Sequence, residues 1–416
     1  MLTPTPEVGA ALAYLRSPGA IRERCREILE LACADRLQHF AYDPAKLTDV
    51  TDEVVAVTRE TYPGLDIPLH SRWRHFNAGG MDRLQQLTHA FAALSRDERA
   101  RSRFELVITS VLLDAGAGAQ WAYREADSDT VYTRSEGLAV ASLHLFLNGG
   151  FASQTDNPLQ ADAAGLQRMT EARLAVAFQV TPDNSLVGLQ GRVTLLRQLG
   201  QAVTATPQVF GETAPRLGHL YDYLGAQATD GVLPARTILK VLLASLSPIW
   251  PHRITLAGIN LGDVWRHSQV APTATDLTAG LVPFHKLSQW LAYSLIEPLQ
   301  EAGVRVVEID ALTGLAEYRN GGLFLDLGVL TPKREAVLAQ EHAPESEVIV
   351  EWRALTVALL DQVAQRVRET LGMTAAELPL GSVLEGGTWR AGRRVAARLR
   401  PDGSPPLRLA SDATVF

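Results

Sequence analysis

The segment SRDERARSRFELVITSVLLDAGAG, residues 95–118, carries the pattern that decides the fold class. Ser95 followed three residues later by Glu98 is the pattern of a capping box, in which two side chains satisfy unpaired backbone N–H groups at the start of a helix. The apolar run that follows continues the helix until Gly116 and Gly118 stop it. The segment therefore predicts a helix between the serine and the glycines.

Helix signals of this kind recur along most of the chain. Ser17 followed by Pro18 predicts a capped helix start, and apolar residues follow it at helical spacing. Ser135 opens another helical stretch, which Gly149 and Gly150 close. Further helices are expected at about 51–61, 81–94, 162–178, 186–204, 235–247, 284–302, 346–371 and 375–385.

Strand signals are few and short. Residues 121–134 predict a hairpin around an acidic turn, and residues 304–309 with 322–330 predict a small ribbon. The C-terminal residues 406–416 carry a similar signal. We therefore expect a mainly α, multi-helix globular fold with a few short β-hairpins or ribbons.

Composition indicates a folded globular protein. Of 416 residues, 46% are hydrophobic and 20% are charged, and the net charge is −7. This balance argues against broad binding to nucleic acid or to an anionic membrane, so neither is an expected partner. With no secretory signal and no uncharged apolar run of about 18 residues, a cytoplasmic location is expected.

The chain shows no flexible linker, charge block or internal repeat. Residues 1–416 are therefore expected to form a single large helical domain. The loop-rich stretch 205–234 is the candidate subdomain boundary within it. The sequence leaves the oligomeric state open.

Several common catalytic motifs are absent from the sequence. There is no P-loop, no dinucleotide fingerprint and no nucleophile elbow. The ten histidines form no H-x-H, H-E-x-x-H or H-x-x-x-H pair, and there is no C-x-x-C. No cofactor and no metal are therefore expected, although metal ligands assembled from distant parts of the chain stay open.

Ionisable residues embedded in hydrophobic stretches are the most useful functional signal. A buried charge costs several kcal/mol unless it is paired, so each such residue needs a partner or a task. Those singled out are Asp263 and Arg266 in INLGDVWRH, Glu317 and Arg319 in TGLAEYRNGG, and Glu351 and Arg353 in VIVEWRALTVALL. Glu351, Arg353 and the aromatic Trp265 are expected to bind substrate.

Two further segments combine basic and aromatic residues in a way that suits an anionic ligand. The first segment lies at the start of a predicted helix and contains one of only four lysines in the chain. The N-terminus of a helix favours anions. In the other, guanidinium groups can clamp phosphate and stack on aromatic faces. A surface lysine beside a core histidine, and a purely structural loop, are the alternatives. The residues concerned are His285 and Lys286 in the first segment, and Arg72, Trp73 and Arg74 in the second.

Paired carboxylates suit the cleavage of a glycosidic bond. Departure of the leaving group builds positive charge on the sugar ring, which a fixed anion stabilises. A second carboxylate can orient the attacking water or bind the ribose hydroxyls. Asp263 and Glu317 are the candidates, because each lies beside an aromatic residue and an arginine in a turn-like segment. From the residues alone, a structural ion pair is the alternative for either.

The sequence resembles the uracil-catabolism protein four family, which belongs to the pyrimidine degradation route that needs no reductase. The resemblance covers nearly the whole chain. In that route a ribosylurea species appears before urea is released, which implies a small-molecule ribosyl or nucleotide-derived substrate. The resemblance is carried in order by residues 67–83, 110–125, 134–142, 191–200, 220–224, 260–267, 280–299, 312–330, 350–361 and 384–389.

Parts of the chain are also similar to the helical queuosine-nucleotide N-glycosidases. GDVW at 262–265 and AEYR at 316–319 are similar to the acidic motifs of that family, and GLVPFHK at 280–286 to its P-F-H segment. This similarity implies acidic roles for Asp263 and Glu317, a supporting role for Arg319, and substrate binding by His285 and Lys286. Glu317 stands where that family has an aspartate, and the P-F-H segment lies between the acidic motifs rather than near the C-terminus.

Three hypotheses follow. In the first, the protein is an N-ribosyl hydrolase that cleaves ribosylurea or its 5′-phosphate, in which Asp263 or Glu317 stabilises the positively charged transition state and positions water. His285, Lys286 and one of Arg72 or Arg74 would hold the phosphate. In the second, the same residues bind a pathway intermediate without cleaving it, or the protein is a scaffold for the ring-opening enzyme. The third is metal-dependent amide hydrolysis of an open-chain ureide.

Overall fold

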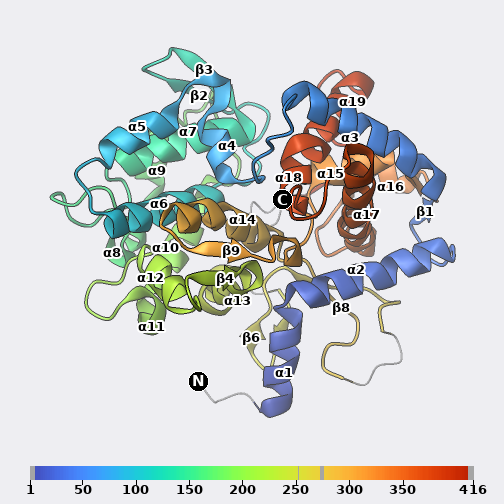
Figure 1. Cartoon of the computed structure of the whole chain (residues 1–416), viewed down its shortest axis with the longest axis horizontal. Coiled ribbons are helices and arrows are strands. Elements are labelled where there is room, and N and C mark those ends of the chain that lie inside the picture. The colour runs from blue at the N-terminus through green and yellow to red at the C-terminus, as the bar shows by residue number, and fades with distance from the viewer. Residues whose placement is uncertain (1–4, 252, 272–275, 411–416) are drawn as a thin grey trace. The chain divides into compact units, whose positions relative to one another are not determined.

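The mainly α fold is confirmed. The computed structural model describes residues 5–251, 253–271 and 276–410. Within these residues helices dominate, and the strands are short and pair only two at a time (Figure 1). None of the described helices is long and apolar enough to cross a membrane.

The chain folds into two compact units, each assembled from separate stretches of sequence. Of the described residues, the first unit comprises 5–70, 253–271, 276–289 and 308–410, and the second comprises 71–251 and 290–307. Residues 205–234 belong to the second unit, and the subdomain boundary expected there stays a prediction.

Eight α-helices and a π-helical segment account for most of the helical structure described in the first unit. Ser17 caps α2 as predicted, because its side chain accepts a hydrogen bond from the backbone N–H of Ala20 at 3.1 Å. The helices are α1 (Pro6–Leu15), α2 (Pro18–Cys33), α3 (Leu47–Thr61), α15 (Tyr318–Asp326), α16 (Ala336–Ala339), α17 (Glu347–Leu371), α18 (Leu380–Val383) and α19 (Trp389–Leu399), with π-helical η5 (Leu384–Thr388) and short η1 (Pro44–Lys46) and η4 (Ile309–Ala311).

Helix α17 is the core of the first unit. It packs against α2, α3 and α15, and most of its side chains along the first four turns are buried (Figure 1). A helix enclosed on all sides can carry charged residues only if each is paired. The charged pair Glu351 and Arg353, embedded in its apolar sequence, therefore needs partners from neighbouring elements.

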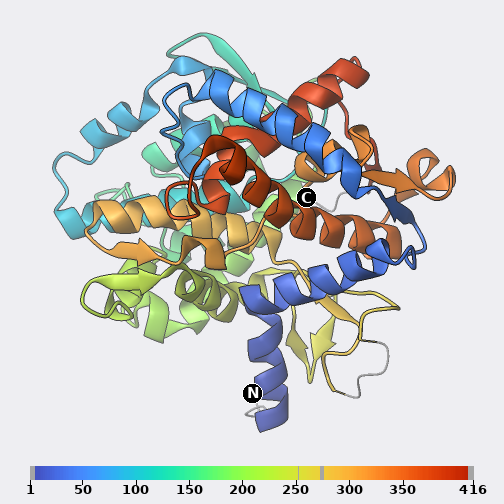
Figure 2. The same ribbon diagram turned by 45° about the vertical axis from the view of Figure 1, so that its right-hand side comes forward.

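The strands of the first unit are brief. Antiparallel β7–β8 adjoins α1, and the buried apolar side chains of the two elements form one cluster together with the β5–β6 region (Figure 2). The strands are β1 (Phe40–Tyr42), β5 (Thr255–Leu256), β6 (Ile259–Asn260), β7 (Val264–Arg266), β8 (Leu281–Pro283), β10 (Leu330–Pro332), β11 (Glu341–His342) and β12 (Arg408–Leu409).

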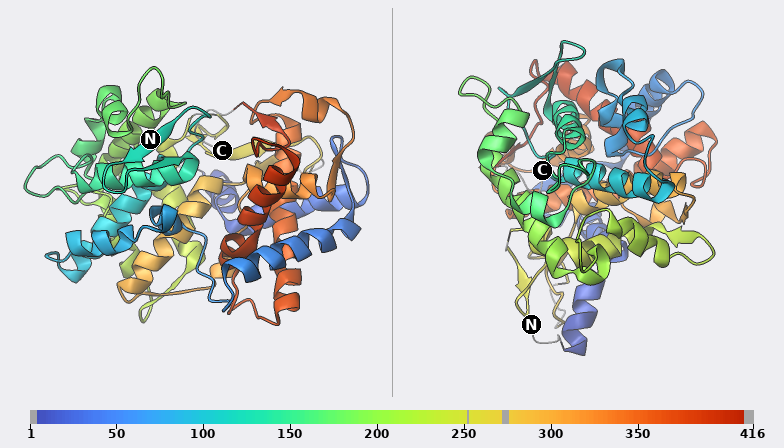
Figure 3. Two further views of the ribbon diagram at one scale, coloured as in Figure 1. Left: turned by 90° about the horizontal axis from the view of Figure 1, so that it is seen from above. Right: turned by 90° about the vertical axis from the view of Figure 1, so that its left-hand side faces the viewer.

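The second unit is a group of helices around α6, α7 and α10 (Figure 3). Ser95 caps α6 as predicted, with its hydroxyl accepting the Glu98 N–H at 3.2 Å. Its helices are α4 (Arg72–Phe76), α5 (Arg83–Ala90), α6 (Arg96–Leu112), α7 (Arg134–Leu147), α8 (Ala163–Gln167), α9 (Glu171–Ala177), α10 (Leu189–Ala205), α11 (Pro207–Phe210), α12 (His219–Ala226) and α13 (Ala235–Leu246), with short η2 (Ala78–Gly80) and η3 (Ser247–Ile249).

The expected hairpin in residues 121–134 is confirmed as β2 (Ala122–Glu125) paired antiparallel with β3 (Thr130–Thr133). The second unit also contains β4 (Val232–Pro234), which pairs in parallel with β9 (Arg305–Val307). Helix α14 (Lys286–Glu301) begins in the first unit and continues in the second.

The ribbon expected between 304–309 and 322–330 is wrong. Residues 318–326 form helix α15, and β9 pairs with β4 instead. The glycines that weakened the helical pattern are required by packing, since a Cβ on Gly321 would lie 2.7 Å from the Trp352 ring of α17. The helix expected at 375–385 begins only at Leu380.

Candidate functional site

Two of the sequence motifs are neighbours in the first unit. Strands β7 and β8 pair so that Val264 lies opposite Pro283, and the backbone N–H of Phe284 donates to the Asp263 carbonyl at 2.9 Å. This pairing brings the INLGDVWRH segment alongside the start of α14. Asp263 therefore lies next to Lys286, although 22 residues separate the two in the chain.

The Asp263 carboxylate is held by four donors. Arg353 binds it with both terminal nitrogens, Nη1 to Oδ1 at 2.7 Å and Nη2 to Oδ2 at 2.8 Å. The Trp265 indole donates to Oδ1 at 2.6 Å, and the backbone N–H of Lys286 donates to Oδ2 at 2.9 Å. Burial opposes ionisation, but the charge of Arg353 and these hydrogen bonds outweigh it and hold the pKa of Asp263 well below its usual range. Asp263 is thus an ionised carboxylate at neutral pH.

His285 fixes the backbone at the start of α14. It is buried, and its φ of 47° lies in the left-handed region that non-glycine residues rarely adopt. Its Nε2 hydrogen-bonds the Leu15 carbonyl at 2.9 Å, and burial lowers its pKa, so the ring is neutral and donates that bond. In this geometry His285 directs the Lys286 N–H at Asp263.

The Glu317 carboxyl differs from that of Asp263 in its hydrogen-bond partners and in the direction of its pKa shift. It is the N-cap of α15, and its two oxygens accept the backbone N–H groups of Arg319 at 2.7 Å and Asn320 at 2.6 Å. Burial raises the pKa of the Glu317 carboxyl, against the opposing effects of those two N–H groups and of the charges of Lys286 and His70. Glu317 therefore takes up a proton more readily than an exposed glutamate.

Arg353 links the two acidic motifs. Besides its bidentate contact with Asp263, its Nε lies 3.5 Å from the carbonyl oxygen of Ala316, the residue before Glu317. Its guanidinium carbon also lies 4.2 Å from the centre of the Phe284 ring. We name Asp263, Lys286, Glu317 and Arg353 the carboxylate site. All four belong to the first unit.

A histidine–glutamate pair extends this site, and the sequence did not single it out. His70 Nδ1 lies 2.8 Å from Glu385 Oε2, and both side chains are buried. The other oxygen of Glu385 accepts the Tyr62 hydroxyl at 3.1 Å. Glu385 lies in η5, and π-helical turns of this kind are frequent at functional sites. The sequence signals were the basic segment 67–83, which contains His70, and the LEGGTW segment, whose double glycine is unusual inside a helix. Neither signal indicates that the two residues pair.

Two buried oxygens near these residues have no hydrogen-bond partner among the described residues. They are Oδ1 of Asn320, in the first turn of α15, and Oγ1 of Thr388, in η5. Helix α15 packs against η5 and α19. A buried oxygen without a partner costs about 1–3 kcal/mol, so both atoms are suited to accept hydrogen bonds from hydroxyl groups of a ligand.

The basic segment of the second unit is tied to its own neighbours. Arg72 is fully buried and binds Ser110 Oγ at 2.7 Å and Asp114 at 3.2 Å. Arg74 pairs with Glu297, and the Trp73 indole donates to the carbonyl of Ser294 at 2.9 Å. Phosphate binding by these residues, jointly with Lys286, stays a prediction.

The remaining predicted residues are also engaged in contacts within the first unit. Arg319 donates to the Gly403 carbonyl at 2.7 Å, and the Trp265 ring is buried. Glu351 accepts the backbone N–H groups of Gln38 and His39 at 3.2 and 3.1 Å. Its role in substrate binding stays a prediction.

Fold and site together define a mainly helical protein in which two carboxylates of different proton affinity surround a buried arginine and a lysine. The chain belongs to the family described as protein of unknown function (DUF1688), whose model matches residues 14–416. It is 42% identical over 413 residues to Protein urg3 of Schizosaccharomyces pombe, covering 97% of this chain and 99% of that protein. It is 36% identical over 438 residues to Uracil catabolism protein 4 of Lachancea kluyveri, with the same coverage. The resemblance to the uracil-catabolism protein four family is confirmed.

Proposed function

We propose that this protein acts in uracil catabolism as an N-ribosyl hydrolase that releases urea from ribosylurea or its 5′-phosphate. The name and near full-length similarity of the Lachancea kluyveri relative support the pathway. The observation that carries the reaction is the carboxylate site, where Glu317 and Asp263 both lie around Lys286 and Arg353.

The proposed reaction is a hydrolysis. A water oxygen attacks the anomeric carbon of the ribose, and the bond from that carbon to the urea nitrogen breaks. The bonding electrons and a proton go to the urea nitrogen, and the attacking water loses one proton. The products are urea and a ribose species, so the protein has to accept one proton and supply another.

Glu317 is the better candidate for that proton transfer. A carboxyl whose pKa is raised by burial exchanges protons nearer to neutral pH, which is what general acid–base catalysis requires. Asp263 is unsuited, because four donors bind it and its pKa is low. Its charge is also largely neutralised by bidentate Arg353, so it adds little stabilisation to a positively charged sugar ring. We assign Asp263 a positioning role.

The other polar groups supply binding. Asn320 Oδ1 and Thr388 Oγ1, which have no hydrogen-bond partner among the described residues, suit the hydroxyl groups of ribose. Lys286 supplies a positive charge beside Glu317, which suits a phosphate or a polarised urea carbonyl. His70, paired with Glu385, is the candidate proton donor to the leaving urea.

A kinetic comparison of variants tests this proposal. Purified protein is incubated with ribosylurea 5′-phosphate, and urea release is measured. Glu317→Gln should lower kcat by at least a hundredfold, because amide cannot accept the proton of water. The matched control is Glu335→Gln, an exposed glutamate of the same unit, which should retain wild-type kcat. Equal kcat in both variants would remove Glu317 from the chemistry.

The capping geometry of Glu317 favours a second candidate function. Because both of its oxygens bind backbone N–H groups, the same site can hold a ribosyl ligand without cleaving it. This binding protein would show saturable affinity for intact ribosylurea 5′-phosphate by calorimetry and no urea release over hours.

A further inference from the structure

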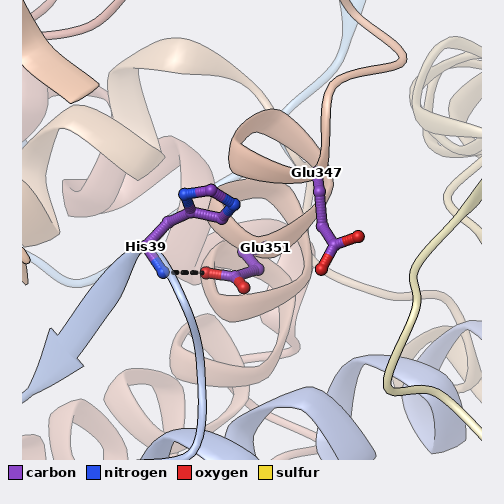
Figure 4. A group of neighbouring side chains, drawn as sticks. All are labelled: His39, Glu347 and Glu351. Carbon is purple, nitrogen blue, oxygen red and sulfur yellow. Dashed lines mark hydrogen bonds between the residues drawn. The ribbon is translucent and has the colours of Figure 1, made fainter. Parts of the chain in front are cut away.

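A histidine and two glutamates gather in the first unit beside the start of α17 (Figure 4). His39 precedes strand β1, Glu347 is the first residue of α17, and Glu351 lies one helical turn further on. One ring nitrogen of His39 and one oxygen of each glutamate all lie within 4.8 Å of one another. We propose that His39, Glu347 and Glu351 bind one divalent transition-metal ion of the zinc class, and we name them the α17 metal site.

The chemistry of the three groups suits such an ion. Imidazole and carboxylate ligands together favour zinc or a neighbouring first-row metal over calcium or magnesium, which prefer oxygen alone. Two ligand atoms at about 2.1 Å from zinc are at most about 4.2 Å apart. The observed spacing therefore needs only a small rotation of the His39 or Glu347 side chain to close around an ion, and water can complete the coordination.

The charge of the cluster favours a cation. Glu351 is fully buried, and among the described residues no lysine or arginine lies within ion-pair distance of it; the His267 ring lies 3.4 Å away. Glu347 adds a second carboxylate within reach of the same point. The ring nitrogens of His39 have no hydrogen-bond partner among the described residues. A divalent ion would offset the charge of the two carboxylates and would use the imidazole as its third ligand.

Neighbouring groups orient the carboxylates. His267 Nδ1 accepts the Gln269 N–H at 3.2 Å, so in its neutral form Nε2 carries the proton and donates toward Glu351. His267 therefore orients a ligand and is not one itself. Ser268 Oγ donates to Glu347 at 2.8 Å in the same way. Such outer contacts are typical of protein metal sites.

The site is separate from the carboxylate site. Glu351 and Arg353 are two residues apart in α17, and successive helical residues are rotated by about 100°, so the two side chains leave the helix in nearly opposite directions. The inferred ion therefore does not enter the proposed hydrolysis. It joins the segment before β1 to the first turns of α17, which makes it a structural ion that stabilises the first unit.

Metal binding by the full-length protein tests this inference. Metal-depleted protein is titrated with Zn²⁺ against a competing chelator, bound metal is counted by mass spectrometry, and the melting temperature is recorded. We expect one Zn²⁺ per chain and a rise in melting temperature on binding. His39→Gln and Glu347→Gln should each weaken binding at least tenfold, because each removes a ligand.

Two control variants test whether the effect is specific to the proposed ligands. They show whether removing another nearby negative charge, or another histidine, has the same effect on metal binding. Glu345→Gln removes an exposed glutamate two residues from Glu347, and His89→Gln removes an exposed histidine of the second unit. Both should bind Zn²⁺ as wild type does. Co²⁺ should give the visible absorption bands of a low-coordinate site in wild type and lose them in both ligand variants. No bound metal, or equal affinity in the ligand variants and the controls, would overturn the inference.

Discussion

Breaking the pair between Arg353 and Asp263 is expected to be costly for stability. The side chains are exposed by only 1% and 13%, and two hydrogen bonds of 2.7 and 2.8 Å join them. Arg353→Met preserves most of the side-chain volume but leaves the Asp263 carboxylate ionised and without a cation. Removing one partner of a buried ion pair typically costs about 3–5 kcal/mol, so we expect the free energy of unfolding to fall by about that amount.

Urea-induced unfolding followed by circular dichroism measures this loss. A double variant with Asp263→Asn is the control, because it removes both charges and leaves no buried carboxylate behind. It should be more stable than Arg353→Met alone. With the Asp263→Asn single variant it completes a double-mutant cycle, from which we expect a coupling energy between the two residues of about 2 kcal/mol or more. If Arg353→Met costs less than about 1 kcal/mol, the pair is not buried as the structure has it.

Three further predictions concern packing and pH. Gly392→Ala places a Cβ 2.3 Å from the carbonyl oxygen of Arg319 and should cost about 1–3 kcal/mol in urea unfolding, whereas a neutral result would refute the close approach of α19 to α15. The ionised form of Glu317 is the proposed base, and the pKa of this carboxyl is raised. The kcat for urea release should therefore fall as the pH is lowered, and its midpoint should lie above the pKa of an ordinary glutamate. A flat pH profile of kcat would argue against this role. Because the pKa of Asp263 is lowered, the contribution of its charge to the free energy of unfolding is fully present above pH about 3.9 and is lost as the pH falls toward the folded-state pKa. The difference in unfolding free energy between wild type and Asp263→Asn should therefore shrink only in strong acid.

Local signals in the sequence predicted local structure well. The serine caps at Ser17 and Ser95 are formed as expected, since a cap depends on residues only three positions away. The hairpin around residues 126–129 is likewise a contact between neighbours in sequence. Strand pairing over long distances was not predictable in this way, and β9 pairs with β4, which lies more than 70 residues earlier.

The glycines of α15 show why one helix was missed. Gly321 and Gly322 lower helix propensity, so the pattern alone favours a strand. Packing against the Trp352 ring requires the absence of a side chain at Gly321, and this requirement becomes visible only once α17 is in place. Tertiary packing therefore overrides the local preference.

The sequence drew attention to residues of the candidate site but did not predict which of them contact one another. Embedded charges drew attention to Asp263, Glu317 and Arg353, because burial demands a partner for each. No spacing rule indicates that Arg353 binds Asp263, 90 residues earlier in the chain. Nor does one indicate that His70 pairs with Glu385, since the fold alone brings these two segments together.

The bond that breaks in the substrate tests the central claim most directly. Ribosylurea 5′-phosphate labelled with ¹³C at the urea carbonyl is incubated with the protein, and the label is followed by ¹³C NMR. Hydrolysis at the anomeric carbon predicts that all of the label appears in intact urea. Label appearing in bicarbonate or carbamate would instead show cleavage of an amide bond, and an unchanged spectrum would show that the protein does not hydrolyse this compound; either result would contradict our account.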